Sequence, residues 1–298
     1  MPDPNTAPPS WPQRHDEIAR TAARQLFFIG GAPRSGTTWL QQILNAHPDI
    51  CCHGEGLFQK HLIEPLETLM AARRDVLDGK NKALFGHTGG YPLPNSDDVD
   101  LLVRTAILLG LSRQCRDRSC LAIGEKTPEN VFQFPRFRHL FPNAKFIAIA
   151  RDPRDVLTSA WHYFHRPVAG EDEIEAKLGF IRSALPSLAE GARAMLSFAE
   201  RYPADCQIVT YESLQRDPEL NASRLFRFLG VGDSPELAAE CIALNSFATL
   251  SGGRSAGEER NGSFFRKGVV GDWRGTLTTE MNEIILRDLG WTFPHFGY

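Results

Sequence analysis

The sequence has no apolar run that approaches the roughly 20 residues of a membrane-spanning helix. Its charges are nearly balanced, with a formal net charge of −3, so there is no electrostatic reason to expect a nucleic-acid or anionic-membrane partner. Residues 1–12 lack both the basic and the apolar part of a signal peptide. These absences predict a cytoplasmic protein with no membrane partner and no nucleic-acid partner.

Cysteine patterns typical of zinc sites or secreted domains are also missing, because no two cysteines have C-x-x-C spacing. We therefore expect reduced, mostly buried thiols, without disulfides and without a metal site. The six cysteines are at positions 51, 52, 115, 120, 206 and 241.

Short apolar segments alternate with helix-like segments along the 298 residues. This alternation predicts an α/β fold with a parallel β-sheet covered by helices on both faces. We see no linker and no internal repeat, so we expect one domain over residues 25–298. Residues 1–24 begin with a proline-rich stretch and are expected to be a disordered lead-in. The expected strands are 26–29, 50–52, 121–126, 144–150 and 206–211.

The first strand runs into a glycine-rich turn, Gly30 to Gly36, and then into a helix-like run that begins at Thr37. Loop amides and the positive end of a helix dipole converge at such a junction and make an anion site. The spacing from Gly31 to Gly36 fits the first half of the P-loop pattern, but Thr37 replaces its lysine. That replacement argues against ordinary ATP or GTP hydrolysis.

The run from Pro33 to Trp39, Pro-Arg-Ser-Gly-Thr-Thr-Trp, resembles the 5′-phosphosulfate loop of sulfotransferases that use 3′-phosphoadenosine 5′-phosphosulfate (PAPS). Arg34 stands where the cytosolic members usually carry lysine. The resemblance implies a P-loop-type sheet, PAPS as sulfonate donor and adenosine 3′,5′-bisphosphate (PAP) as product. It assigns the 5′ group to Arg34, Ser35, Gly36, Thr37 and Thr38.

Two further segments resemble the 3′-phosphate motifs of this superfamily. The run 151–163 matches the first, which implies that Arg151 and Ser159 bind the 3′-phosphate; from the residues alone, an ion pair for Arg151 and packing for Ser159 remain open. The run 265–274 matches R-K-G-x-x-G-D-W-[KR], although a pair of cations is more often a solvated turn. This second motif implies phosphate contacts from Arg266, Lys267 and Gly268.

Three aromatic residues, Trp39, Tyr211 and Phe247, match the adenine-contacting positions of the superfamily. Each can stack on a purine face, and each can equally be a core residue.

Sulfonate transfer needs a base for the acceptor's proton and cations for the charge that develops on oxygen. The cytosolic enzymes use the histidine of a Lys-Thr-His run, but here the run is Lys126-Thr127-Pro128. The neighbourhood of Glu55 resembles the tyrosylprotein and Golgi-type enzymes, whose base is a glutamate, so Glu55 is the expected base. An exposed loop carboxylate is the other interpretation of Glu55, and the other base candidates are His53, Glu125 and Glu129.

Lys126 and Arg34 are the expected catalytic cations, and a structural ion pair is the alternative for Lys126. The predicted function is sulfonate transfer from PAPS to a hydroxyl or amine of a small-molecule acceptor, without a metal. The alternatives are a small-molecule kinase and a non-catalytic nucleotide-binding protein.

We expect residues 57–115 and 165–195 to line the acceptor pocket. Four aromatics in or next to these ranges suggest an apolar or aromatic acceptor, or are simply core residues: Phe85, Tyr91, Phe164 and Phe180. Arg274, Thr278 and Glu283 loosely follow a dimerisation motif of the cytosolic enzymes and suggest a homodimer.

Overall fold

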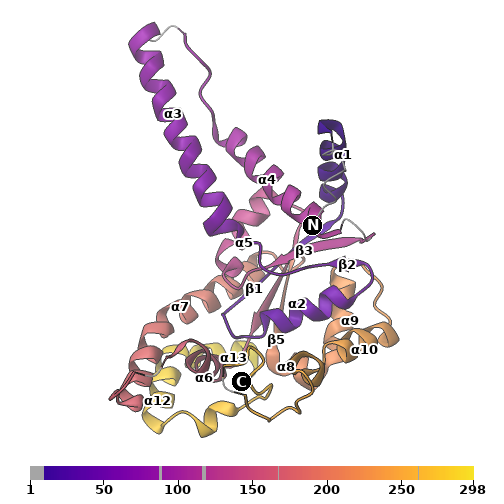
Figure 1. Ribbon diagram of the computed structural model, residues 1–298, viewed down its shortest axis with the longest axis vertical. Helices are drawn as coiled ribbons and strands as arrows, with labels where there is room; N and C mark the ends of the chain where they lie inside the picture. The colour runs from indigo at the N-terminus through magenta and orange to yellow at the C-terminus, as the bar shows by residue number, and fades with distance from the viewer. Residues whose placement is uncertain (1–9, 87–88, 116–118, 167, 261) are drawn as a thin grey trace.

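The computed structural model describes residues 10–86, 89–115, 119–166, 168–260 and 262–298. Five parallel strands form one sheet in the order β2-β3-β1-β4-β5 (Figure 1). Ile29 of the central strand pairs with Lys126 on one side and Ile147 on the other, so the carboxyl ends of these strands lie together. The strands are β1 (Gln25–Gly31), β2 (Ile50–Cys51), β3 (Ala122–Lys126), β4 (Lys145–Ala150) and β5 (Cys206–Thr210).

Helices cover both faces of this sheet, as the alternating pattern predicts. Apolar side chains such as Phe28 and Phe146 face one core, and others such as Phe27 and Ile147 face a second core on the opposite face. The first core is closed by α1 (Trp11–Ala22), α4 (Ser96–Ser112), α5 (Asn130–Leu140) and α7 (Glu173–Arg201). The second is closed by α2 (Thr37–Ala46), α8 (Tyr211–Arg216), α9 (Pro218–Phe228) and α10 (Pro235–Leu244).

A third apolar cluster joins α6 (Pro153–Phe164) and α7 to α12 (Thr279–Leu289). Short helical segments complete the chain: η1 (Gln59–Ile63), η2 (Arg113–Cys115), α11 (Phe247–Ser251), η3 (Asp272–Gly275), η4 (Gly290–Thr292) and α13 (Phe293–Phe296). Within the described ranges, no helix has both the length and the apolar character needed to cross a membrane. Together these elements form a single α/β domain.

The expectation of disorder over residues 1–24 is wrong for the part that forms α1; residues 1–9 lie outside the described residues. Ser10 caps this helix, and its backbone amide donates to the side chain of Gln13 over 2.7 Å. Proline lies in the first turn, where it is compatible with a helix. Ile18 packs against the first core, which holds the helix in place.

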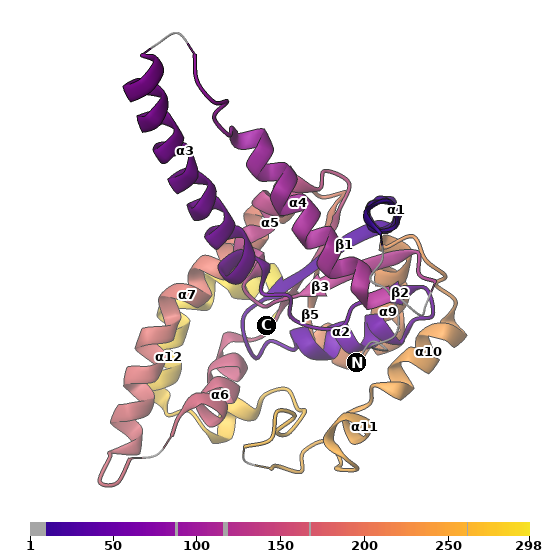
Figure 2. The ribbon, with the colours of Figure 1, turned by 45° about the horizontal axis from the view of Figure 1, so that its top comes forward.

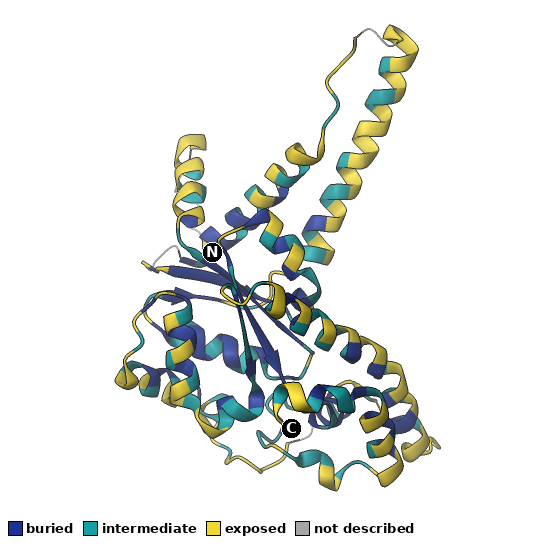
Figure 3. Ribbon diagram, turned by 180° about the vertical axis from the view of Figure 1, so that it is seen from behind, coloured by how far each residue is buried: buried dark blue, intermediate teal, exposed yellow. Residues whose placement is uncertain are grey.

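The helix α3 (Glu64–Phe85) projects from the domain together with α4 (Figures 1 and 2). None of its residues is buried, and it is mostly exposed along its length (Figure 3). The helix ends at Phe85, and the next helix, α4, begins at Ser96. Both Phe85 and Tyr91 are more than half exposed. Phe180 packs edge-on against Trp161.

All six cysteines are buried, in line with the expectation of mostly buried thiols. The sulfur atoms of Cys51, Cys115 and Cys120 lie within 4.8 Å of one another. Hydrogen bonding to Cys120, together with burial, raises the pKa of the Cys115 thiol. This grouping of thiols was not anticipated from their spacing in the sequence.

Candidate active site

The turn between β1 and α2 has the backbone of an anion-binding loop. Arg34 and Gly36 adopt positive φ angles of 71° and 99°. A Cβ atom on Gly36 would lie 2.6 Å from the Tyr211 ring, so the position requires glycine. Ser35 is fully buried, and its hydroxyl oxygen has no hydrogen-bond partner among the described residues. The first-turn amides of α2 point into the same turn.

Arg34 connects this loop to the second predicted motif. Its guanidinium lies between the rings of Tyr163 and Phe264, at 4.3 and 4.7 Å from their centroids. Its Nε donates to the Ser159 hydroxyl over 3.3 Å. Burial lowers the pKa of Arg34, and the nearby cations Arg151 and Arg266 lower it further. The structure thus brings together basic residues from all three motifs.

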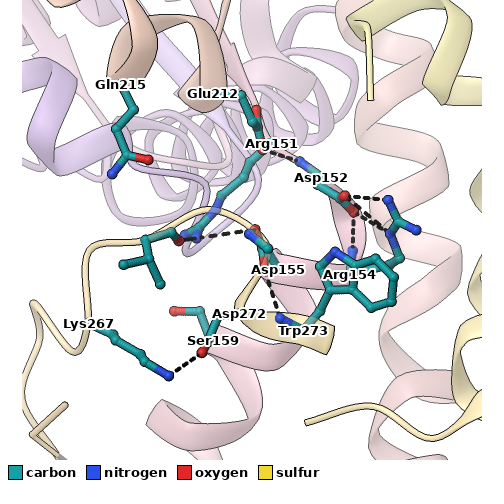
Figure 4. A network of polar contacts seen from close by, with 12 residues as sticks. Arg151, Asp152, Arg154, Asp155, Ser159, Glu212, Gln215, Lys267, Asp272 and Trp273 are labelled. Atoms are coloured by element: carbon teal, nitrogen blue, oxygen red, sulfur yellow. Dashed lines mark hydrogen bonds and ion pairs between the residues drawn. The ribbon is translucent and has the colours of Figure 1, made fainter. Parts of the chain in front are cut away.

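Arg151 is held by backbone carbonyls at the carboxyl end of β4 (Figure 4). Its Nη2 donates to the carbonyl of Val269 over 2.9 Å, and its Nη1 donates to the carbonyl of Arg34 over 3.3 Å. The guanidinium also lies 4.1 Å above the Tyr211 ring and 3.8 Å from Asp155. Its Nε is buried and has no hydrogen-bond partner within the described part of the chain. Arg151 therefore has an ion-pair neighbour and still keeps a free donor.

Arg266 and Lys267 form ion pairs with acidic residues of their own segment. Arg266 contacts Asp272 and lies 2.7 Å from Glu259. Lys267 lies 2.5 Å from Asp272 (Figure 4). Burial alone would raise the pKa of Asp272, but hydrogen bonds from the two cations outweigh it and hold that pKa low. The carboxylates of Glu259 and Asp272 thus pair with the two cations that the sequence predicts to bind a phosphate.

The three predicted aromatics surround one cavity. Trp39 and Tyr211 meet edge to face with centroids 5.4 Å apart, and the Trp39 indole donates to the Asn245 carbonyl over 3.0 Å. Phe247 lies against Gly268, whose φ is +66° and whose added Cβ would come within 2.2 Å of the ring. Tyr211 is buried and also lines the cavity, so it is both a core residue and a cavity residue.

This cavity has a volume of about 510 Å³ and lies at the carboxyl ends of the strands. Of the predicted site residues, only Ser35 and Lys126 do not line it. Those that do are Arg34, Gly36, Thr37, Thr38, Trp39, Glu55, Arg151, Ser159, Tyr211, Phe247, Arg266, Lys267 and Gly268. Of the four aromatics expected near the acceptor, the cavity includes Phe164 alone.

Glu55 and Lys126 form an ion pair at the edge of the cavity. The Lys126 ammonium donates to the Glu55 carboxylate over 2.5 Å and to the Thr38 hydroxyl over 3.1 Å. The Lys126 side chain is 3% exposed, whereas the Glu55 side chain is 44% exposed. Lys126 therefore sits behind the wall of the cavity and connects Glu55 to the first turn of α2.

The other base candidates differ sharply in position. Glu125 is buried and accepts hydrogen bonds from Thr127 (2.5 Å), Asn130 (2.6 Å) and the Gly56 amide (2.7 Å). Burial raises its pKa. Glu125 does not line the cavity, and its bond to Gly56 instead anchors the turn that carries Glu55. His53 is also outside the cavity wall, whereas Glu129 lines it.

Sequence reasoning missed several residues that organise this site. Tyr163 and Phe264 enclose Arg34, and Gln215 donates to the Gly268 carbonyl over 2.7 Å. The buried carboxylate of Asp155 accepts from the amides of Gly271 and Trp273, over 2.7 and 3.1 Å (Figure 4). Tyr163 and Asp155 lie within the second motif, run 151–163, and this location was the available signal that they belong to the site.

Residues 27–235 match the model of a family described as the sulfotransferase family. A candidate protein-tyrosine sulfotransferase of Caenorhabditis briggsae is 32% identical over 213 residues, covering 72% of this chain and 68% of the relative. Cytosolic sulfotransferase 17 of Arabidopsis thaliana is 29% identical over 162 residues, covering 46% of each chain. The matched segment thus spans less than half of that Arabidopsis relative.

Solved structures show the same fold. A mouse sulfotransferase crystallised in complex with PAP superposes with a TM-score of 0.52 at 18% identity, covering 94% of this chain and 88% of that one. A sulfotransferase from Mycobacterium avium gives a TM-score of 0.54 at 16% identity, covering 95% and 80%. The family match over residues 27–235 and the 32% identical relative show that the chain belongs to the sulfotransferase family.

Proposed function

We propose that this chain transfers a sulfonate group from PAPS to a hydroxyl or amine of an apolar or aromatic small-molecule acceptor. The observation that carries the proposal is the convergence of Arg34, Arg151, Arg266 and Lys267 on one cavity with hydroxyl and amide donors. A ligand with anionic groups at both its 5′ and 3′ positions fits such a distribution of cations.

Unused donors in and beside this cavity support a polyanionic ligand. Arg151 Nε, Arg266 Nε and the Ser35 hydroxyl are buried without hydrogen-bond partners among the residues that the structure describes. Buried polar atoms normally have partners, and an exception calls for an explanation. The mouse sulfotransferase was crystallised as a complex with PAP, which agrees with this choice of ligand.

The residues around the 5′ end support in-line transfer. PAPS supplies a sulfonate on a stable leaving group. In our proposal the α2 amides and Arg34 orient the 5′ group, and Glu55 accepts the proton of the acceptor hydroxyl. Lys126, which contacts the Thr38 hydroxyl, neutralises negative charge near the same turn. Leu57, Tyr163 and Phe164 give the acceptor side of the cavity an apolar wall.

Calorimetric titration tests the donor part of the proposal. We expect PAP to bind at least about tenfold more tightly than 5′-AMP or ATP–Mg²⁺, because only PAP engages Arg151 at the 3′ position. Arg151→Met should remove this preference. Arg182→Met, which removes an arginine whose side chain is 61% exposed on α7, should leave it intact. Tighter binding of ATP–Mg²⁺ than of PAP would favour a kinase instead.

An acceptor screen then tests transfer itself. Purified protein with PAPS is assayed by release of PAP against phenols, aliphatic alcohols, amines and a tyrosyl peptide. We expect turnover with an apolar or phenolic small molecule and a loss of turnover in Glu55→Gln. Binding of PAP with no transfer to any of these acceptors would instead indicate a non-catalytic nucleotide-binding protein.

A further inference from the structure

The segment between α11 and η3 is rich in Gly, Ser and Arg, and by composition it looks mobile. In the structure it is folded around one side chain, Arg254 (Figure 2 shows its path after α11). We call residues 251–260 and 262–268 the cofactor clip, because this segment ends in Arg266, Lys267 and Gly268. Positive φ angles at Gly252, Gly253 and Gly257 let the chain fold back on itself.

The guanidinium of Arg254 donates hydrogen bonds to oxygen atoms in both parts of the clip, residues 251–260 and 262–268. Its Nη1 donates to the carbonyl of Arg266 over 2.7 Å and to the carbonyl of Glu258 over 3.0 Å. Its Nη2 donates to the Phe265 carbonyl and, over 3.2 Å, to the Ser263 hydroxyl. The five donors of a planar guanidinium suit this arrangement, and one ammonium group cannot reproduce it.

Among the described residues, a few backbone hydrogen bonds join residues 251–260 to residues 262–268. The Gly257 amide donates to the Lys267 carbonyl over 2.9 Å, and the Arg260 amide donates to the Arg266 carbonyl over 3.2 Å. Both bonds end on the residues predicted to bind the 3′-phosphate. The Arg254 side chain adds a second set of bonds to the carbonyls of Phe265 and Arg266, so it fixes the backbone from which the phosphate ligands project.

Arg254 also contacts the adenine side of the cavity. Its guanidinium carbon lies 5.4 Å from the centroid of the Phe247 ring, and the same ring packs against Gly268. Arg254 itself is not among the residues that line the cavity. Its influence on a bound nucleotide must therefore pass through Phe247, Arg266 and their neighbours.

We propose that Arg254 is a positioning residue that preorganises the clip and couples recognition of the 3′-phosphate to stacking at Phe247. The inference rests on the proposed function of the cavity. Without Arg254, the clip must be ordered at the moment of binding, and that cost reduces the affinity for the nucleotide. The Glu55–Lys126 pair lies outside the clip, and saturating PAPS orders the clip, including Phe264 beside Arg34, so we expect little change in the chemical step at saturating PAPS.

The test compares steady-state kinetics and PAP binding in Arg254→Met, Arg254→Lys and Arg260→Met. Arg260 lies on the same clip, and the last variant removes a charge but none of the carbonyl contacts described. We expect Arg254→Met to raise the KM for PAPS and the Kd for PAP at least about tenfold, or 1.4 kcal/mol. The acceptor KM and kcat at saturating PAPS should change less than about twofold, which a general loss of structure would not produce.

A separate measurement tests the coupling between recognition of the 3′-phosphate and stacking at Phe247. The ratio of PAP affinity to 5′-AMP affinity should fall in Arg254→Met and stay at the wild-type value in Arg260→Met. Arg254→Lys should retain a minor part of the lost affinity, since it keeps the charge but not the planar set of donors. Hydrogen exchange should show weaker protection of residues 262–268 in Arg254→Met, without change in β1 or β4.

Wild-type values for PAP in Arg254→Met would overturn the inference, and so would equal losses in Arg254→Met and Arg260→Met. If Arg254→Met does not fold, Arg254→Lys is tested in its place. The inference then requires a raised KM for PAPS with a nearly unchanged kcat. Failure of the proposed function looks different, because wild-type protein would then show no preference for PAP. Loss of PAP binding in Arg151→Met but not in either Arg254 variant would leave the function intact and reject the role of Arg254.

Discussion

Replacing the two members of the Glu55–Lys126 pair should have unequal effects on stability. The Lys126 side chain is 3% exposed, so Glu55→Ala leaves a buried ammonium with only the Thr38 hydroxyl as a described partner. An uncompensated buried charge costs about 3 kcal/mol of unfolding free energy. Lys126→Met leaves Glu55, which is 44% exposed and can be hydrated, so its cost should stay below about 1 kcal/mol.

Thermal and urea unfolding measure this asymmetry. In a chain of this size each kcal/mol shifts the Tm by about 2 °C, so Glu55→Ala should melt roughly 6 °C below wild type and Lys126→Met within about 2 °C of it. Glu55→Gln is the matched control, because its amide oxygen still accepts from Lys126. Since the amide carries no negative charge, this variant should melt between Glu55→Ala and wild type.

The same variants separate stability from catalysis. Glu55→Gln keeps the hydrogen bond but cannot take a proton, so kcat should fall by about 100-fold or more while PAP affinity is unchanged. Equal melting temperatures for Glu55→Ala and Lys126→Met would refute the assignment of the buried charge to Lys126. A Glu55→Gln enzyme with wild-type kcat would refute Glu55 as the base and direct attention to Glu129.

Two further variants test the surroundings of the site. Because burial raises the folded-state pKa of Glu125 above its ordinary value of 4.5, wild-type stability should fall as pH rises from 4.5 through the raised value. Glu125→Gln lacks this titration, so its stability relative to wild type should increase between pH 5 and pH 8 in urea unfolding; a pH-independent difference would contradict this. Gly268→Ala should weaken PAP binding at least about tenfold in calorimetry, since its φ of +66° and the Phe247 ring leave no room for a methyl group. Gly275→Ala, where nothing lies within 4 Å of an added Cβ, is the control, and equal affinities in both variants would argue against a rigid clip.

Short-range patterns were sufficient for the sheet and for most helices, and the resemblance to sulfotransferases supplied the list of residues around the cavity. Strand-to-helix turns such as 30–37 and 150–153 are local features, so short-range patterns locate them. They failed at residues 11–22, where Ser10 capping and the packing of Ile18 override a proline-rich start. They also failed at Arg254, whose partners lie up to 12 residues away in a segment with no regular structure.

The tertiary structure separates the four base candidates by position, since Glu55 and Glu129 line the cavity whereas His53 and Glu125 do not. Glu125 and Lys126 are neighbours on β3, and successive side chains of a strand point to opposite faces, so one is buried beneath Gly56 while the other reaches Glu55, 71 residues away. The contact of Arg34 with Ser159, 125 residues apart, likewise requires β1 and β4 to be adjacent. Local sequence determined which chemical groups end each strand, and strand order and side-chain direction decided which of those groups meet.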